Sequence, residues 1–243
     1  MAKIPHDPKE IFDEITKDYQ AVYGKELIAI LLYGSAASGN YVRKKSDINF
    51  LIVLTEEGIG QLQKSFKTVE KWYKRRVSTP LFLTKSYISS SLDSFPIEFL
   101  NMQNSYQVVF GEDVLQELSF DKHHLRLQCE KELKGKLLQL RQGFLESGGK
   151  KKNLIFIIGR SLTAFISIFR ALLYLNDKVV PAELRNIISL VSQEFGVDEK
   201  TFVTLVQIKE GTEKLSSKAL SSLFSNYISE VRKLAYAVDQ LTI

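Results

Sequence analysis

The pattern of hydrophobic and polar positions divides the chain into two halves of different character. Up to about residue 118, helical spacing alternates with short apolar runs rich in β-branched and aromatic residues, which is typical of a mixed α/β unit. Beyond that point apolar residues recur at helical spacing almost without a break. We therefore expect an α+β protein, with a small mixed β-sheet domain over residues 1–118 and an all-α helical bundle over residues 119–243.

In the first half the pattern predicts one helix that starts at the N-cap Asp7 and ends near Gly24, because Asp and a following Pro favour a helix start and Gly favours a stop. A second helix is predicted over Glu57–Lys74. Strands are predicted over Leu27–Tyr33, Asp47–Leu54, Thr79–Leu83, Pro96–Met102 and Tyr106–Phe110, with a helical turn over Ala36–Gly39 and a short helix from Glu112.

In the second half the pattern predicts five helices, separated by Gly and Pro residues. Their expected ranges are 121–146, 152–176, 182–195, 199–209 and 217–240. The run Leu154–Leu175 is long enough to raise the question of a membrane span. It contains Arg160 and Arg170, each of which costs roughly 2.5–3.5 kcal/mol at a membrane centre. We therefore expect a bundle helix, and no membrane partner.

Composition and charge narrow the class of protein. The formal net charge is +5, which tolerates an anionic partner but does not require nucleic acid, so an RNA-binding function would rest on charge alone. Cys129 is the single cysteine and forms no internal disulfide. The N-terminal residues lack the apolar core of a signal peptide. A cytoplasmic protein is expected.

The candidate chemistry lies in two short segments. Gly34-Ser35 follows a buried strand, where glycine permits close approach of the backbone and free amides of a helix start can bind phosphate. Asp47 and Asn49 stand two residues apart on the next strand, so that both side chains leave the same face. A carboxylate and an amide oxygen at a strand edge are suitable ligands for Mg²⁺.

The combination of strand, Gly-Ser, spacer and Ser-Asp-x-Asn resembles the nucleotidyltransferase superfamily of DNA polymerase β type, over residues 25–115. The resemblance implies that Gly34 and Ser35 hold a nucleoside triphosphate, expected to be ATP, and that carboxylates bind Mg²⁺. It also implies transfer of a nucleoside monophosphate to a hydroxyl acceptor, which the sequence does not identify. Glu98 matches the third carboxylate, and Gly111-Glu112-Asp113-Val114-Leu115 resembles the end of minimal bacterial domains of this type.

Asn49 departs from the superfamily pattern, which has a second metal-binding carboxylate there. An asparagine brings an oxygen ligand without the negative charge, so that metal affinity should fall. Two hypotheses therefore remain open: an active nucleotidyltransferase that uses Asp47, Asn49 and Glu98, and a catalytically silent relative that binds nucleotide or a protein. Structural roles also remain open, with Gly34-Ser35 as an ordinary turn, Asp47 as a cap and Glu98 as an exposed strand residue.

The helical half resembles the substrate-binding helical domain found beside such bacterial nucleotidyltransferases. Arg160 and Arg170 fall on one polar stripe of the helix predicted over 152–176 and are candidates for acceptor or phosphate contacts, the alternative being a solvated face. Arg43 and Lys44 precede the metal strand and are candidates for triphosphate contacts, the alternative being a solvated loop. The apolar helices are compatible with a homodimer.

Overall fold

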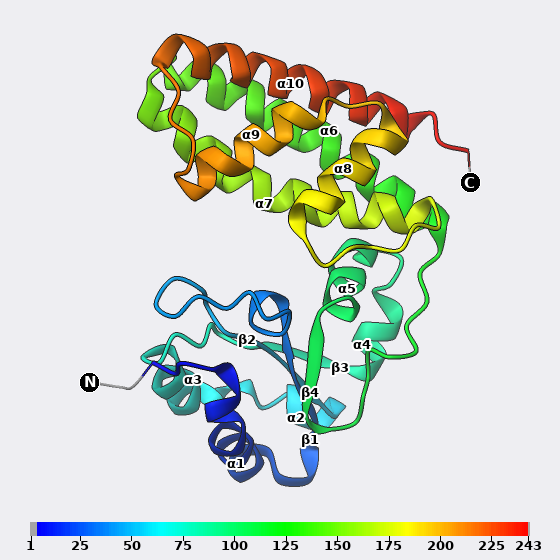
Figure 1. The fold of residues 1–243 in the computed structure, drawn as a ribbon. Coiled ribbons are helices and arrows are strands. Elements are labelled where there is room, and N and C mark those ends of the chain that lie inside the picture. The colour runs from blue at the N-terminus through cyan, green and yellow to red at the C-terminus, as the bar shows by residue number, and fades with distance from the viewer. Residues whose placement is uncertain (1–3, 243) are drawn as a thin grey trace. The chain divides into compact units, whose positions relative to one another are not determined.

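The computed structural model describes residues 4–242. The chain divides into two compact units, and each is described by itself (Figure 1). The first unit comprises Met1–Asp93 and Glu98–Ser119, and the second comprises Ser94–Ile97 and Phe120–Ile243. The expected fold class is confirmed: a small mixed sheet with helices precedes a bundle made of helices alone.

The first unit is built on a four-stranded sheet with strand order β3-β2-β1-β4. Strand β1 pairs antiparallel with both β2 and β4, whereas β3 lies parallel to β2 at the edge. The strands are β1 (Leu27–Tyr33), β2 (Asn49–Leu54), β3 (Leu81–Thr84) and β4 (Tyr106–Gly111). The helices are α1 (Phe12–Tyr23), α2 (Glu56–Ile59), α3 (Phe66–Tyr73), α4 (Lys85–Ser90) and α5 (Pro96–Gln103), with 3-10 turns at Pro8–Ile11, Gly24–Glu26, Gly34–Ala36 and Leu62–Ser65. The first two residues of α5 are counted with the second unit.

One face of the sheet carries the main core of this unit, and α1 and α3 cover it (Figure 1). The alternation of side chains along β1 and β2 sends every second residue into this core, because successive strand residues point to opposite faces. Trp72 of α3 is fully buried there, and its indole Nε1 donates a hydrogen bond to Asp18 Oδ2 at 2.9 Å. The core residues from the first 3-10 turn, α1 and the two central strands are Ile11, Ile15, Tyr19, Tyr23, Leu27, Ile30, Leu32, Phe50, Ile52 and Leu54.

The predicted strand over Pro96–Met102 is wrong, because these residues form helix α5. Pro96 occupies the first helical position, where its missing N–H costs nothing and its fixed φ suits the helix. Two other predictions also differ from the structure. The helix expected over Glu57–Lys74 is divided into α2, a 3-10 turn and α3, and no helix follows Glu112 in the described chain before α6.

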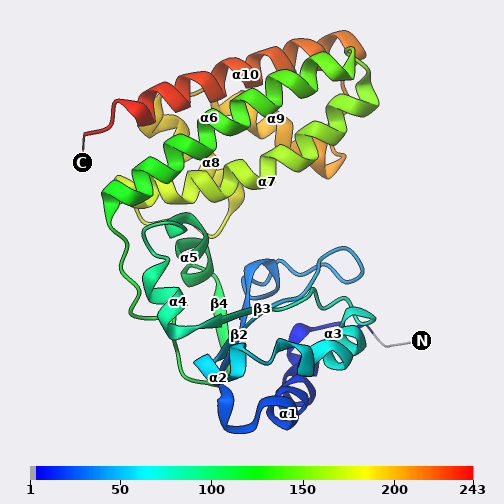
Figure 2. The same cartoon turned by 180° about the vertical axis from the view of Figure 1, so that it is seen from behind.

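The second unit contains five helices, whose predicted bounds are confirmed to within two residues. They are α6 (Lys122–Ser147), α7 (Lys151–Leu175), α8 (Leu184–Phe195), α9 (Glu199–Glu210) and α10 (Ser217–Asp239). Helix α6 packs against both α7 and α10, and α8 and α9 lie on α7 (Figure 2). Cys129 is buried on α6, as expected for a small apolar thiol.

Helix α7 is the one helix among residues 4–242 that is long and apolar enough to cross a membrane. Its apolar side chains instead form the centre of the bundle. Phe165 packs edge-on against Tyr227 of α10, and Phe169 packs edge-on against Phe202 of α9, with ring centroids 5.6 and 5.2 Å apart. The apolar residues of α7 are therefore explained by its packing in the centre of the bundle.

Candidate functional site

The chain makes a tight turn where β1 ends, and Gly34 is its first residue. Gly34 has a φ of +77°, in the region that favours glycine. Its N–H donates to the Ser105 carbonyl at 3.0 Å, and the Ser105 hydroxyl donates to the Gly34 carbonyl at 3.2 Å. The amides of Ala37 and Ser38 donate to the same carbonyl, at 3.0 and 3.1 Å. The turn is thus fixed to the residue that precedes β4.

Ser35 is the exposed residue of this turn, and its hydroxyl makes no hydrogen bond within residues 4–242. The helix expected to begin here is a 3-10 turn of three residues, Gly34–Ala36. The Gly34 amide is bonded to Ser105, and the Ala37 and Ser38 amides are bonded to Gly34, so the Ser35 hydroxyl is the side-chain group of the Gly-Ser pair that can donate to a ligand.

Asn49 lies beside this turn because β1 and β2 are adjacent antiparallel strands. Tyr33, the last residue of β1, is the register partner of Asn49, the first residue of β2. A Cβ built on Gly34 would be 3.6 Å from Asn49 Nδ2. Asn49 alternates with Phe50 and Ile52, which face α1, so its side chain leaves the opposite face of the sheet. Asn49 of the Ser-Asp-x-Asn segment therefore lies against the Gly-Ser turn.

Asp47 is exposed just before β2, and its side-chain surface is 58% accessible. Arg76 Nη1 lies 3.8 Å from Asp47 Oδ1. The position of Arg76 follows from the backbone: the Ile48 amide donates to the Arg76 carbonyl at 3.0 Å, and Ile48 forms a parallel bridge with Val77. The guanidinium also donates to the Lys44 carbonyl.

Sequence reasoning missed Arg76, because it predicted the strands near residues 47 and 79 but not their pairing. In the structure β3 lies parallel to β2. In a parallel pair the residues that enter the two strands lie side by side. An arginine just before the third strand is therefore placed to contact an acid just before the second.

The two candidate triphosphate contacts have different surroundings. Arg43 is half-buried, and its Nε and Nη2 donate to the Ile4 carbonyl at 3.2 and 3.0 Å. Part of its hydrogen-bonding capacity is thus used to hold the N-terminal segment. Lys44 is exposed and has a φ of +67°. Its ammonium makes no ion pair within the described residues.

Glu98 is an exposed residue of helix α5 rather than of a strand. Within residues 4–242 no group of three or more His, Cys, Asp or Glu side chains is placed to hold a metal ion. Near the turn, the side-chain oxygens that could bind a cation are those of the Asp47 carboxylate and the Asn49 amide. Mg²⁺ commonly uses one or two carboxylates together with substrate phosphates, so these residues suit one nucleotide-bound Mg²⁺ better than two.

The two arginines of α7 are placed differently within the second unit. Arg160 is exposed, lies 5.7 Å from the Phe156 ring centroid and lines a cavity of about 450 Å³ between α6 and α7. Arg170 does not line that cavity. It is half-buried, and burial lowers the pKa of its guanidinium. The predicted polar stripe also includes Thr163, whose hydroxyl accepts from Lys209 Nζ of α9 at 2.7 Å.

Lys209 is a second residue that the sequence analysis missed. Burial lowers the pKa of its ammonium, which donates a hydrogen bond to the neutral hydroxyl of Thr163. It was missed because the helical pattern of α9 gives no sign of which face meets α7.

No protein-family model matches the sequence. No curated protein sequence matches it either. The structure is similar to the crystal structure of spectinomycin adenyltransferase AAD(9) from Enterococcus faecialis with ATP and spectinomycin. The TM-score is 0.55 at 10% sequence identity, covering 92% of this chain and 99% of that one. The chain therefore shares the fold of that adenyltransferase, a small mixed sheet followed by a helical bundle.

Proposed function

We propose that this chain, built on the nucleotidyltransferase fold, transfers a nucleoside monophosphate from a Mg²⁺-bound nucleoside triphosphate to a hydroxyl acceptor. The observation that carries the proposal is the meeting of the Gly34 turn with Asn49 and the neighbouring Asp47 at one end of β1 and β2. A phosphate-binding turn beside oxygen ligands for a cation is the arrangement that nucleotidyl transfer needs.

The proposed roles follow from the exposure of each group. Ser35 donates to a phosphate oxygen through its free hydroxyl, and Gly34 lets the backbone approach the phosphates. Lys44 adds a positive charge near them. Asp47 and Asn49 hold the cation, which supplies charge neutralisation for the pyrophosphate leaving group. Glu98 remains our candidate for orienting or deprotonating the acceptor hydroxyl.

The acceptor is proposed only as a class. The structural neighbour is an adenyltransferase described with ATP and spectinomycin, so ATP and small polyhydroxylated molecules are the first nucleotide and acceptors to test. Arg160 and Arg170 are the candidates in the helical unit for contacts with the acceptor or a phosphate. We propose that the chain carries out this reaction in the cytoplasm.

The test is a calorimetric titration of a non-hydrolysable ATP analogue, with and without Mg²⁺, into the wild-type chain and into Asp47→Ala. Binding that needs both Mg²⁺ and Asp47 supports the proposal. Asp13→Ala is the matched control, because Asp13 is an exposed aspartate of α1 on the same unit. Equal binding by Asp47→Ala and wild type would overturn the assigned metal site. Pyrophosphate release across an acceptor panel then tests catalysis itself.

A second candidate function is a catalytically silent nucleotide-binding or interaction protein, and a specific contact favours it. Asp47 is 3.8 Å from the Arg76 guanidinium, and Asn49 is uncharged, so the formal charges of these three side chains sum to zero. A neutral site attracts Mg²⁺ weakly. The variant Asn49→Asp separates the two functions. A gain of metal affinity or activity indicates a decayed site, whereas a loss of activity indicates that Asn49 is the working residue.

A further inference from the structure

The surface between α6 and α10 contains a groove that the proposed function does not use. Its volume is about 560 Å³, which lies within the range of small-molecule sites. All of its lining belongs to the second unit. The lining residues that matter below are Lys134, Arg141, Arg232, Lys233, Tyr236 and Asp239.

Two of the four cations in this groove are already neutralised by carboxylates. Lys134 Nζ contacts Glu130 Oε1 at 2.5 Å and Asp239 Oδ1 at 2.9 Å, and the second contact joins α6 to α10. Lys233 Nζ lies 2.8 Å from Glu230 Oε1. These ion pairs hold the rim of the groove in place. They also neutralise Lys134 and Lys233, so neither lysine has an unpaired charge for a ligand.

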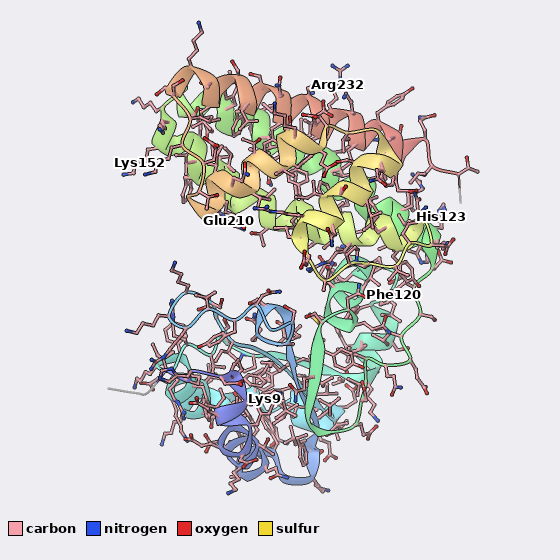
Figure 3. The ribbon with its side chains drawn as sticks, in the orientation of Figure 1. Lys9, Phe120, His123, Lys152, Glu210 and Arg232 are labelled. Carbon is pink, nitrogen blue, oxygen red and sulfur yellow. The ribbon has the colours of Figure 1, made fainter. Side chains whose placement is uncertain are left out.

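The other two cations have no such partner. Arg141 on α6 and Arg232 on α10 make no ion pair and no hydrogen bond within residues 4–242, and both are exposed. Arg232 projects away from the bundle (Figure 3). Because both line the same groove, two uncompensated guanidinium groups share one small volume. A guanidinium group can bind phosphate through two parallel N–H···O hydrogen bonds, and two guanidinium groups match the charge of one phosphate dianion.

Tyr236 supplies the third element of the groove. Its side chain is 69% exposed, although tyrosine rings of this bundle such as Tyr227 are buried. It stands four residues after Arg232, so that both lie on the same face of α10. An exposed ring beside two arginines can stack on a planar group carried by the anion.

We propose that the α6/α10 groove binds a phosphate monoester whose organic group carries an aromatic or heteroaromatic ring. Arg141 and Arg232 bind the phosphate, and Tyr236 stacks on the ring. Charge argues against a second copy of this chain as occupant, because the same cationic face would meet itself. Extended nucleic acid is also disfavoured as the occupant, because Glu130, Glu230 and Asp239 already neutralise the two lysines and leave only two cations for a phosphate backbone.

The test titrates phenyl phosphate into the full-length chain by calorimetry, with phenol and inorganic phosphate as the comparison ligands. Phenyl phosphate is expected to bind more tightly than either. Arg141→Ala and Arg232→Ala should each weaken it by about tenfold, which corresponds to one charge-assisted contact. Tyr236→Ala should weaken phenyl phosphate but leave inorganic phosphate unchanged. All three residues are exposed, so these variants are expected to fold.

Arg185→Ala is the matched control, because Arg185 is an exposed arginine of α8 outside the groove. Asp47→Ala should also leave this binding unchanged, which separates it from the proposed nucleotide site. Binding that survives both arginine substitutions, or that falls equally in Arg185→Ala, would overturn the proposal. Adenosine monophosphate and a phosphotyrosine peptide, titrated in parallel, distinguish a free nucleotide from a modified protein as the source of the ligand.

Discussion

At the scale of single residues, two glycines with the same backbone conformation have different surroundings. Gly34 and Gly111 both have a φ of +77°. A Cβ on Gly34 would meet Asn49 Nδ2 at 3.6 Å, an ordinary contact, whereas a Cβ on Gly111 would be 2.0 Å from the Ile28 carbonyl oxygen. Gly111 therefore allows β4 to end against β1, which gives a structural reason for the glycine of the Gly111–Leu115 segment.

We expect Gly34→Ala to lower the free energy of unfolding by roughly 1–2 kcal/mol, from the left-handed backbone alone. Gly111→Ala should cost more, because backbone must also move away from the new methyl group. Urea denaturation of the two variants measures both values. Equal losses would show that the approach of Gly111 to Ile28 is not rigid.

Arg76 offers a prediction about the candidate site. Arg76→Asn removes the cation near Asp47 and keeps a residue that tolerates a φ of +67°. Since exposed ion pairs contribute up to about 1 kcal/mol, binding of the Mg²⁺-bound ATP analogue should tighten by about two- to fivefold. Lys67→Asn, which removes an exposed cation from α3, is the control for overall charge. Weaker binding by Arg76→Asn would instead assign the guanidinium to the nucleotide.

At the scale of elements, the start of α9 is held by two carboxylates from different parts of the bundle. Asp198 is the N-cap and accepts hydrogen bonds from the Thr201 amide at 3.0 Å and from the Thr201 hydroxyl. Glu230 of α10 is buried, and its Oε2 accepts from the Asp198 amide at 2.8 Å. The cap thus fixes α9 to α10 as well as beginning the helix.

Asp198→Ala should lower the free energy of unfolding by about 1 kcal/mol at neutral pH. The hydrogen bonds from Thr201 hold the pKa of Asp198 below its usual value. The charged cap therefore stabilises the fold above about pH 4, and this contribution is lost as pH falls through the lowered folded-state pKa. Urea denaturation at pH 7 and pH 3 should show the stability gap between wild type and Asp198→Ala narrowing in acid.

The variant Asp198→Asn is the control for this pH dependence, because it keeps a capping oxygen but removes the titrating carboxyl group. The stability gap between Asp198→Asn and Asp198→Ala should be the same at both pH values. A gap that narrows in acid for this pair as well would assign the pH dependence to another group.

The elements that the sequence predicted well are those whose hydrophobic pattern fits only one type of secondary structure. Helices α6 to α10 have long apolar periodicity with Gly or Pro breaks, and β1 is a continuous apolar run. Helix α5 was missed because its short run of Ile97, Phe99 and Leu100 suits a strand equally well. In that segment Pro96 was the better guide, since proline favours a first helical position.

The sequence identified the residues of the candidate site that lie at the ends of its two apolar strands, namely Gly34, Ser35, Asp47 and Asn49. Gly34 and Asn49 meet because β1 and β2 form an antiparallel pair. The sequence predicted both strands but not their pairing. Arg76 was not predicted, because its position depends on β3 lying parallel beside β2. The strand expected to carry Glu98 is helix α5 instead, so the contribution of Glu98 to the site remains a prediction.

At the scale of the whole molecule, the candidate nucleotide site lies on the first unit and the α6/α10 groove on the second. A ligand that binds only the folded state stabilises it by about 2.7 kcal/mol at one hundred times its Kd. The Mg²⁺-bound ATP analogue should therefore raise the unfolding temperature of the first unit, as measured by scanning calorimetry. The same shift in Asp47→Ala would contradict the assigned site.

Trp72 has a consequence for how such unfolding is observed. It is the single tryptophan of the chain, and it is buried in the first unit between Asp18 and the Arg75 guanidinium, whose Cζ is 4.6 Å from the ring centroid. Tryptophan fluorescence is therefore an optical label for the sheet unit alone, whereas far-ultraviolet circular dichroism is weighted toward the five helices of the second unit. Coincident transitions in the two signals would mean that both units unfold cooperatively, and separate transitions would assign each step to its own unit without any added dye.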